Sequence, residues 1–386
     1  MRIRFCYLVL LLLCSTHLFA KPALVQAAAT QLRPVAGSSH LPAGWLTLQV
    51  ETPDGLLDLR LQPATRLETN ASPMVPAIRD GRTRIYQGTV AGQPSSWVRL
   101  SRIGDAWLGA IQVADKLWLL DPAREHRQLA GQLGLGDNDT LVFTLSDLQG
   151  MDFLLDHGGV AVPASAMEDV TAYPTDDTQN TGASESFLGV TLVLDTEFQA
   201  HYGSDASSTA VAILNIVDGL YMANASIHVY LHALEALTDN GLLTDTNADE
   251  LLQDFQSWFF SSSLPFSGTA QLMSGKNFDD STVGMAWLGQ ICSRRFGNGV
   301  NQMTFSAAGS AVILAHEMGH NFDLDHDGDG NTCASSGFIM NASINLGNPP
   351  TQFSSCSLQA LDDYLTNNNL ACLASPPVLI FENSFE

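Results

Sequence analysis

The stretch HEMGHNFDLDHDGDG, residues 316–330, holds three histidines, one glutamate and four aspartates. His316 and His320 are four residues apart, so on a helix their imidazoles project from one face, about one turn apart. Glu317 stands beside the first, which completes the HExxH pattern of zinc proteases. His326 adds a third imidazole, and a catalytic zinc ion needs three protein ligands and one open position. The sequence therefore predicts a zinc site made by His316, His320 and His326.

Asp323 stands where the chain must turn back if His326 is to reach the metal. In the longer pattern HExxHxxGxxH a glycine fills this place, because the turn uses a left-handed backbone conformation. Asp and Asn tolerate that conformation best among the other residues. We therefore expect Asp323 to be left-handed, at a cost of about 1 kcal/mol, which is small beside the binding energy of a zinc ion.

Residues 307–322, AAGSAVILAHEMGHNF, have the periodicity of a helix that carries the first two histidines. The alternative is a solvated cluster of surface histidines, but the apolar run before His316 would bury this helix against a core. A buried metal helix is the interpretation we favour.

The acidic residues after the helix offer a second metal. Asp325, Asp327, Asp329 and Gly330 match the opening of a calcium loop, but its twelfth place holds Ser336 instead of glutamate. A solvated acidic turn is the simpler interpretation, and Ca²⁺ stays a second candidate cofactor.

The chain is strongly acidic. It has 386 residues, enough for two domains, with 40 acidic and 17 basic residues and a formal net charge of −23. From residue 183 onward the basic residues are Lys276, Arg294 and Arg295, against 22 acidic ones. Such a surface repels nucleic acid and anionic membranes, so we exclude nucleic acid as a partner.

The N-terminus predicts export. Residues 1–20, MRIRFCYLVLLLLCSTHLFA, place two arginines before an apolar run and end on a small residue, which is the pattern of a secretory signal peptide. The run is too short for a stable membrane span, and no later segment is apolar enough for one. We expect a secreted, extracellular protein, or a periplasmic one in a bacterium.

The cysteines agree with export. After the expected signal peptide the chain has four of them, Cys292, Cys333, Cys356 and Cys372. An even number in an exported chain predicts two disulfides, whose pairing the spacing alone leaves open.

The chain divides near residues 169–186, a segment rich in Thr, Ser, Asp and Gly that predicts an exposed linker. Before it, residues 45–120 form short alternating runs, which predict a mainly β domain over residues 21–182. After it, strand and helix patterns alternate in a domain over residues 183–375, with helices expected at 208–224 and 248–260, followed by a tail, 376–386. Such alternation predicts an α/β fold with a mostly parallel sheet covered by helices.

At this point the sequence resembles a known family. HEMGHNFDLDHD, residues 316–327, is similar to the HExxHNxGxxHD motif of the reprolysin or adamalysin-like branch of the metzincin zinc endopeptidases, which includes the ADAM proteases. Asp323 departs from that motif. Met340 stands where the family has a methionine turn below the zinc. Residues 277–299 and 352–373 resemble the family's edge strand with its cysteine loop and its last helix.

The resemblance implies disulfides Cys292–Cys372 and Cys333–Cys356. Toward the N-terminus the resemblance extends to about residue 80, and it implies that the first half is a prodomain. In relatives the prodomain inhibits the protease through a cysteine. Residues 21–182 contain no cysteine. Latency by the chain's own prodomain would then need another group, and the candidates are Asp152, Asp156, His157 and Asp169.

The resemblance also implies a function and a mechanism. The chain would be a secreted zinc endopeptidase, made as a zymogen, that hydrolyses peptide bonds of extracellular proteins. A zinc-bound water would attack the peptide carbonyl, with Glu317 as general base and Met340 in a structural role. The strand Met285–Gly289, with Ala286, Trp287, Leu288 and Gly289, would pair with an extended protein substrate, and residues 340–350 would wall a side-chain pocket.

Three other functions have to be weighed. The first is a zinc-binding extracellular protein of the same fold whose catalysis Asp323 impairs, although retention of Glu317 argues against it. The second is a zinc hydrolase with non-peptide substrates. The third is an extracellular adhesin or structural module in which the metal only stabilises the fold, and a closed site with a fourth protein ligand would support it.

Overall fold

The computed structural model describes residues 23–24, 26–34, 42, 44–71, 73–149, 154–155, 158–163, 186–303, 306–344, 350–368 and 370–373. The expected signal peptide, the linker before residue 186 and the tail at 376–386 lie outside the described residues. The candidate latency residues Asp152, Asp156, His157 and Asp169 do so too, as do residues 345–349 of the expected pocket wall.

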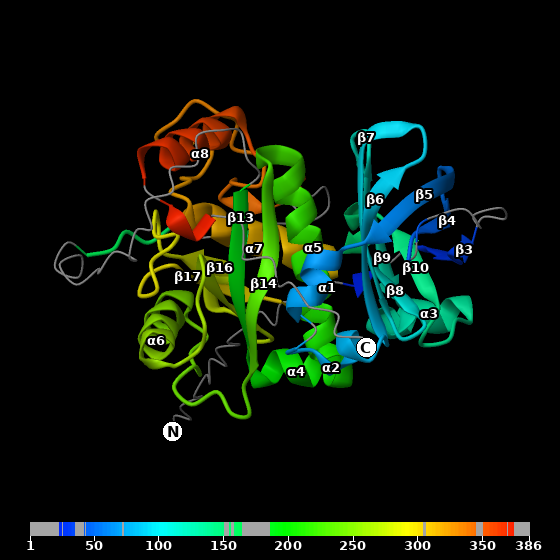
Figure 1. Cartoon of the computed structure of the whole chain (residues 1–386), viewed down its shortest axis with the longest axis horizontal. Helices are drawn as coiled ribbons and strands as arrows, with labels where there is room; N and C mark the ends of the chain where they lie inside the picture. The colour runs from blue at the N-terminus through cyan, green and yellow to red at the C-terminus, as the bar shows by residue number, and fades with distance from the viewer. Residues whose placement is uncertain are drawn as a thin grey trace, which may run out of the picture.

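The N-terminal half forms a nine-stranded sheet, on the right in Figure 1. Neighbouring strands in this sheet are all antiparallel, because short turns join most successive strands. In spatial order the strands are β2 (Ala28–Thr30), β10 (Thr140–Phe143), β9 (Lys116–Pro122), β8 (Ala106–Val113), β7 (Gln93–Ile103), β6 (Thr83–Val90), β5 (Gly55–Pro63), β4 (Leu46–Thr52) and β3 (Arg33–Pro34). The predicted β character of residues 45–120 is confirmed.

Short helices accompany this sheet: α1 (Thr65–Ala71), α2 (Pro76–Arg79) and α3 (Arg127–Leu133). One face of the sheet has its own apolar cluster, which includes Val50, Leu61 and Trp118. The opposite face contributes Ile85, Trp97 and other residues to a larger core that also contains residues of the C-terminal half. The two halves of the chain therefore share one apolar core.

The C-terminal half contains a five-stranded sheet in the order β14 (Ile227–Ala236), β13 (Ser186–Leu194), β15 (Thr269–Ser274), β17 (Asn298–Gln302) and β16 (Gly284–Ala286). The pairs β13–β14, β13–β15 and β15–β17 are parallel, and β16 joins the edge antiparallel to β17. Two-stranded pairings of β1 (Ala23–Leu24) with β11 (Leu148–Gln149) and of β12 (Leu154–Leu155) with β18 (Ser343–Ile344) are antiparallel.

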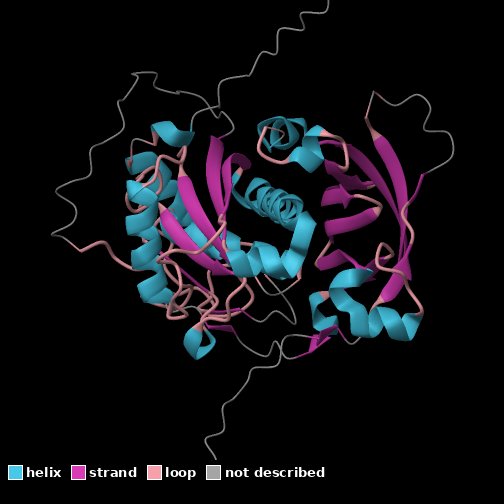
Figure 2. Cartoon of the chain, turned by 90° about the horizontal axis from the view of Figure 1, so that it is seen from below, coloured by secondary structure: helices cyan, strands magenta, loops and turns pink. Residues whose placement is uncertain are grey.

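Helices flank the five-stranded sheet on both sides, as Figure 2 shows. They are α4 (Thr196–Tyr202), α5 (Ala206–Ala225), α6 (Ala248–Ser261), α7 (Ala307–Asn321) and α8 (Ser355–Asn367). The predicted helices at 208–224, 248–260 and 307–322 match α5, α6 and α7. Local chemistry fixes their starts: the Asn247 side chain accepts hydrogen bonds from two amides of α6, and Ser306 caps α7 in the same way.

Helix α5 lies between the two sheets (Figure 1), in contact with β14 on one side and with β7 and β8 on the other. Within the described residues, the stretch Thr196–Ala225 is long and apolar enough to cross a membrane by composition, but 83% of its apolar window is buried inside the protein. Such burial is that of a core helix.

Polar contacts also cross the interface between the halves. Arg99 of β7 donates hydrogen bonds from Nε and Nη2 to Asp218 of α5, at 3.0 and 2.8 Å, and both side chains are buried. Burial alone would raise the pKa of Asp218, but the Arg99 guanidinium and other hydrogen bonds hold it below its usual value. Gly219 allows this approach, since a Cβ there would lie 2.8 Å from Cγ of Arg99.

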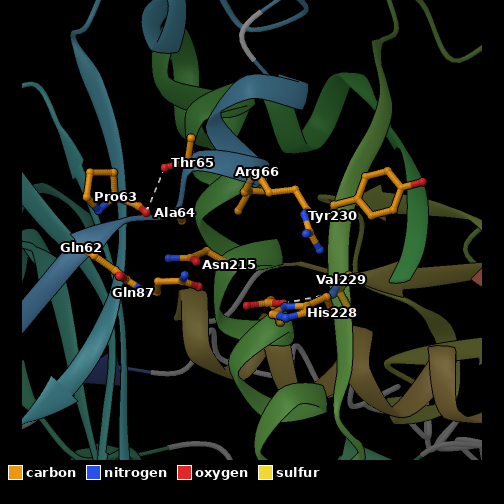
Figure 3. Close-up of a pocket in the computed structure, with 12 residues that line it drawn as sticks. Gln62, Pro63, Ala64, Thr65, Arg66, Gln87, Asn215, His228, Val229 and Tyr230 are labelled. Carbon is orange, nitrogen blue, oxygen red and sulfur yellow. Dashed lines mark hydrogen bonds and ion pairs between the residues drawn. The ribbon is translucent and has the colours of Figure 1, made fainter. Parts of the chain in front are cut away.

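Beside this ion pair the interface contains a cavity of about 380 Å³. Figure 3 shows that α1 and strands of both sheets line it, with Arg66, Asn215 and His228 among the lining side chains. The Arg66 guanidinium lies 3.8 Å from the ring centre of Phe187, on which His228 stacks. His228 is therefore a packed interface residue.

Candidate functional site

Helix α7 carries His316 and His320 on one face, and both imidazoles are buried. The turn after the helix brings His326 beside them. The Nε2 atom of His316 lies 3.1 Å from that of His320 and 3.3 Å from that of His326. Among the described residues these three histidines form a group whose ligand atoms could hold one metal ion. The structure thus brings together the three ligands predicted from the sequence.

The outer nitrogens of two imidazoles are fixed by backbone carbonyls. His316 Nδ1 lies 2.5 Å from the carbonyl oxygen of Ile339, and His320 Nδ1 lies 2.7 Å from that of Leu324. An Nδ1–H that donates to a carbonyl leaves the Nε2 lone pair for a metal. Zinc–nitrogen bonds of roughly 2.0–2.1 Å in tetrahedral geometry place ligand nitrogens about 3.3 Å apart, so the observed separations fit zinc.

Asp323 makes the turn to the third histidine with a φ of +67°, so the predicted left-handed conformation is confirmed. Its amide donates to the carbonyl of His320 at 2.9 Å. Burial raises the pKa of the Asp323 carboxyl, and Asp325 adds to the effect. The side chain borders Gly289, where a Cβ would lie 2.7 Å from the Asp323 carboxylate. An aspartate therefore replaces the family's glycine without loss of the turn.

Met340 lies beneath the histidines and is fully buried. Its sulfur contacts Gly319, between the two helical histidines, where a Cβ would lie only 2.4 Å from Sδ. The carbonyl of Met340 accepts a hydrogen bond from the amide of Asp327 at 2.8 Å. This is the floor expected of a methionine turn.

The Asp327 carboxylate accepts hydrogen bonds from the hydroxyls of Ser354 and Ser357 at the start of α8. These contacts anchor α8 to the histidine loop, so Asp327 has a structural explanation. The acidic loop of Asp325, Asp327 and Asp329 does not form a second metal-holding group among the described residues. The calcium hypothesis is unsupported.

Glu317 is fully buried on α7 beside His316. Its carboxylate reaches β16 at Gly284, where a Cβ would lie 2.1 Å from Oε1 and 2.6 Å from Cδ. Only a residue without a side chain leaves room for the carboxylate in this position. Sequence reasoning did not find Gly284, because its proximity depends on how the edge strand lies on α7.

The edge strand is shorter than predicted. Of the expected Met285–Gly289 strand, β16 includes residues only up to Ala286, Trp287 makes an isolated bridge, and Leu288 and Gly289 form a turn. Gly289 has a φ of +66°, which ends the strand, and its amide donates to the carbonyl of His320 at 2.9 Å. The prediction of a five-residue strand was therefore wrong at its end.

Asn321, the last residue of α7, was also missed. It is buried, and Nδ2 donates to the carbonyls of Trp287 and Asn298 at 2.9 and 3.0 Å. Its Oδ1 accepts from the side chains of Thr269 and Gln271, both at 2.8 Å. Asn321 thus ties α7 to β15, to β17 and to Trp287, and the asparagine after HExxH was the available signal.

A segment of the N-terminal half lies along this edge. Val160 forms a parallel bridge with Trp287. The amide of Val160 donates to the carbonyl of Ala286 at 2.8 Å, and the amide of Leu288 donates to the carbonyl of Val160 at 2.9 Å. The edge of β16 therefore already binds an extended polypeptide through main-chain hydrogen bonds.

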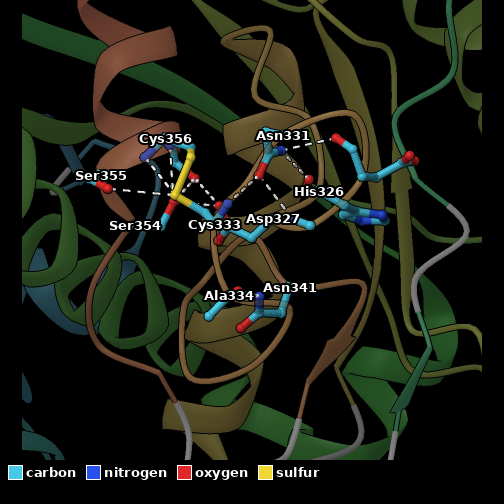
Figure 4. Close-up of a disulfide and its surroundings, with 12 residues drawn as sticks. His326, Asp327, Asn331, Cys333, Ala334, Asn341, Ser354, Ser355 and Cys356 are labelled. Carbon is cyan, nitrogen blue, oxygen red and sulfur yellow. Dashed lines mark hydrogen bonds between the residues drawn. A yellow bond between two sulfur atoms is a disulfide. The ribbon is translucent and has the colours of Figure 1, made fainter.

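Two disulfides brace the site: Cys292–Cys372 and Cys333–Cys356, the pairs that the resemblance implied. Figure 4 shows the second beside the histidine loop, which it links to α8. Asn331 organises the same loop, because its Nδ2 donates to the carbonyl of His326 at 2.8 Å. The position of the third histidine is thus fixed by covalent and polar contacts.

Comparison of the sequence with known proteins agrees with this geometry. Residues 186–377 match the sequence model of the family described as "Reprolysin (M12B) family zinc metalloprotease". These residues are a reprolysin-family domain. The chain is also similar to disintegrin and metalloproteinase domain-containing protein 15 of Homo sapiens, with 37% identity over 171 residues, or 40% of this chain and 20% of that protein. The chain thus matches about a fifth of the length of this relative. Reprolysins are zinc metalloproteases, and the three-histidine group lies within the matched region.

Proposed function

We propose that this reprolysin-family protein is a zinc-dependent endopeptidase that hydrolyses peptide bonds of extracellular proteins. One observation carries the proposal: a buried three-histidine group with Glu317 beside it lies next to a strand edge that binds an extended polypeptide through its backbone. Main-chain pairing gives affinity for many sequences, which suits proteins as the substrate class.

In this proposal His316, His320 and His326 hold Zn²⁺ as neutral imidazoles. A bound zinc ion would supply Lewis acidity, which polarises the peptide carbonyl and lowers the pKa of a water molecule. Glu317 takes the proton of the attacking water and passes it to the departing amine, which is the work of a general base and then a general acid. Its low exposure favours this role, because a buried carboxylate is held in one geometry.

The edge of β16 positions the substrate. Ala286 offers its carbonyl and Leu288 its amide to an extended chain, as both already do to Val160. Trp287 lies between these two residues on the edge, and Asn321 holds its carbonyl from behind. Met340 keeps a structural role below the histidines.

The proposal also assigns a separate function to each part of the chain. Residues 1–20 direct secretion to the extracellular space or periplasm, residues 21–182 act as a prodomain that inhibits the enzyme, and residues 183–375 catalyse. The shared apolar core and the contact of Val160 with the edge strand support inhibition by the N-terminal half.

A catalytically impaired zinc-binding protein is the alternative, and Asp323 was the reason to consider it. The structure supplies no distortion to support it, since the Asp323 turn leaves the imidazole nitrogens at separations that suit zinc.

Casein hydrolysis tests the proposal. All fourteen basic residues of the N-terminal half precede residue 128, so trypsin alone would leave residues 128–185 joined to the remainder. Every protein tested therefore carries Gln179→Arg, which places a trypsin site in the expected linker. With this site trypsin should detach and degrade the N-terminal half and spare the remainder, which has three basic residues. The full chain is treated with trypsin, the trypsin is blocked by an inhibitor that leaves metalloproteases untouched, and casein hydrolysis is measured with and without a zinc chelator.

Glu317→Gln should lower the rate roughly 100- to 10,000-fold while zinc content is retained. Glu250→Gln, on the exposed side of α6, is the matched control and should hydrolyse casein at the wild-type rate. Wild-type rates in Glu317→Gln, or activity that survives the chelator, would contradict the proposal.

A further inference from the structure

We take the proposed peptide-binding groove to be bounded by β18 and by the edge at β16, and residues of the N-terminal half pair with both. On one side β12 pairs antiparallel with β18, with Leu154 opposite Ile344 and Leu155 opposite Ser343. On the other side Val160 bridges Trp287 in parallel. Residues 158–160 are the described part of the segment that joins these two pairings along the chain.

Between these two pairings the segment passes the histidines at two glycines. Gly158 has a φ of +91°, a conformation that favours glycine, and a Cβ there would lie 3.5 Å from Cε1 of His326. A Cβ on Gly159 would lie 3.0 Å from Nδ1 of His320 and 2.7 Å from Cδ1 of Leu288. The backbone of Gly159 thus lies so close to the imidazole that no side chain fits without a shift.

Beyond the bridge the segment is held by a side chain. Val162 is 6% exposed and belongs to the apolar cluster that contains Met285 and Trp287 of the edge. Ala161, between the two valines, is exposed, as alternation along an extended chain requires. Main-chain hydrogen bonds, close glycine contacts and one buried valine together fix residues 158–162 against the histidines and the edge at Trp287.

We propose that residues 158–162 are a main-chain strap that closes the peptide-binding groove of the intact chain, with Gly158 and Gly159 in place of a metal-binding cysteine. The inference rests on the proposed function and specifies how that site is regulated. The strap inhibits by occupying the place of the substrate backbone. Because it is tethered to the same chain, its effective concentration at the groove is high even if its own affinity is modest.

Variants of the full chain test the strap. Gly159→Ala should displace it, because the added methyl group overlaps Leu288 and His320, and Val162→Asp should do so by placing a charge in the apolar cluster. Ala161→Asp adds the same charge at the exposed neighbour and is the matched control. Casein hydrolysis is measured before and after the trypsin treatment.

Before trypsin, we expect hydrolysis by Gly159→Ala and Val162→Asp to exceed that of the wild type roughly tenfold, while Ala161→Asp equals the wild type. After trypsin, all four should be equally active. If all four rise together on trypsin treatment but are equally latent before it, the strap is wrong and the endopeptidase stands. If none hydrolyses casein after trypsin, both proposals fail.

Hydrogen exchange supplies a readout that does not depend on activity. The amides of Val160 and Leu288 are protected by the strap's two hydrogen bonds, so both should exchange roughly tenfold faster in Gly159→Ala. The amide of Leu192 in the inner strand β13 is the internal reference and should not change. A misfolded variant would accelerate its exchange as well. Unchanged exchange at Val160 and Leu288 would overturn the inference.

Discussion

The Glu317 carboxylate lies against the backbone of Gly284, where a Cβ would come within 2.1 Å of Oε1. The proposed general base on α7 and the start of the proposed substrate edge on β16 are therefore in direct contact. Any side chain at position 284 must move the carboxylate or push the strand away from the helix. In the proposed mechanism Gly284 is a positioning residue, because it determines where the Glu317 carboxylate lies.

Gly284→Ala should lower casein hydrolysis by trypsin-treated enzyme roughly 100-fold, because a displacement of about 1 Å in a catalytic group can cost that much. The loss should appear in kcat with zinc content unchanged, since the histidines are not touched. Ser257→Ala, at an exposed position of α6 in the half that the treatment retains, is the control. Equal kcat values for the two variants would show that Glu317 tolerates the methyl group.

A second prediction concerns pH. Glu125, just before α3 at the interface, has a pKa raised to about 7 by burial, with Asp121 and Asp205 adding to the effect against Arg124 and His126. His201 also faces it at 3.7 Å. The folded state therefore prefers the protonated carboxyl, so its contribution to stability is complete below about pH 4.5 and is lost as pH rises through about 7.

Glu125→Gln should remove this dependence. Relative to the variant, the wild type should lose about 2 kcal/mol of unfolding free energy between pH 5 and pH 8, measured by urea denaturation. Glu51→Gln, at an exposed position of β4, should keep the wild-type slope. If Glu125→Gln and the wild type change in parallel over this range, the raised pKa is not coupled to folding.

A third prediction concerns the turn at Asp323. A β-branched residue is strained at a φ of +67°, so Asp323→Val should cost about 1–2 kcal/mol and speed the loss of zinc to a chelator. Asp323→Asn should stay near the wild type, because asparagine tolerates the same conformation. Asp325→Val, two residues further along the same loop, is the control for replacing an aspartate by valine without the left-handed backbone. An equal cost for valine at both positions would contradict the role given to the turn.

The features that the sequence predicted are local. The spacing of His316 and His320 is a property of the helix itself, and the left-handed turn at Asp323 follows from the residue types allowed there. Helices α5, α6 and α7 were predicted nearly to the residue because their apolar periodicity is long.

The features that were missed depend on distant parts of the chain. Leu288 and Gly289 leave the strand because Gly289 is left-handed and its amide pairs with His320, which no period-two pattern reveals. Val160 meets Trp287 across more than a hundred residues, and nothing in the sequence GGVAV announces that contact. The sequence also predicted a β domain without indicating that one face of its sheet would cover α5.

Helix α5 has almost no side facing water, because β14 covers one flank and the nine-stranded sheet the other. Hydrolysis of the chain between residues 163 and 186 would remove the covalent link but leave this buried surface in place. We expect the two fragments to remain a tight heterodimer, because separation would expose a large apolar area to solvent. Full release of the protease would then require the N-terminal fragment to be digested or unfolded, so activation would follow the lifetime of that fragment more closely than the moment of the cut.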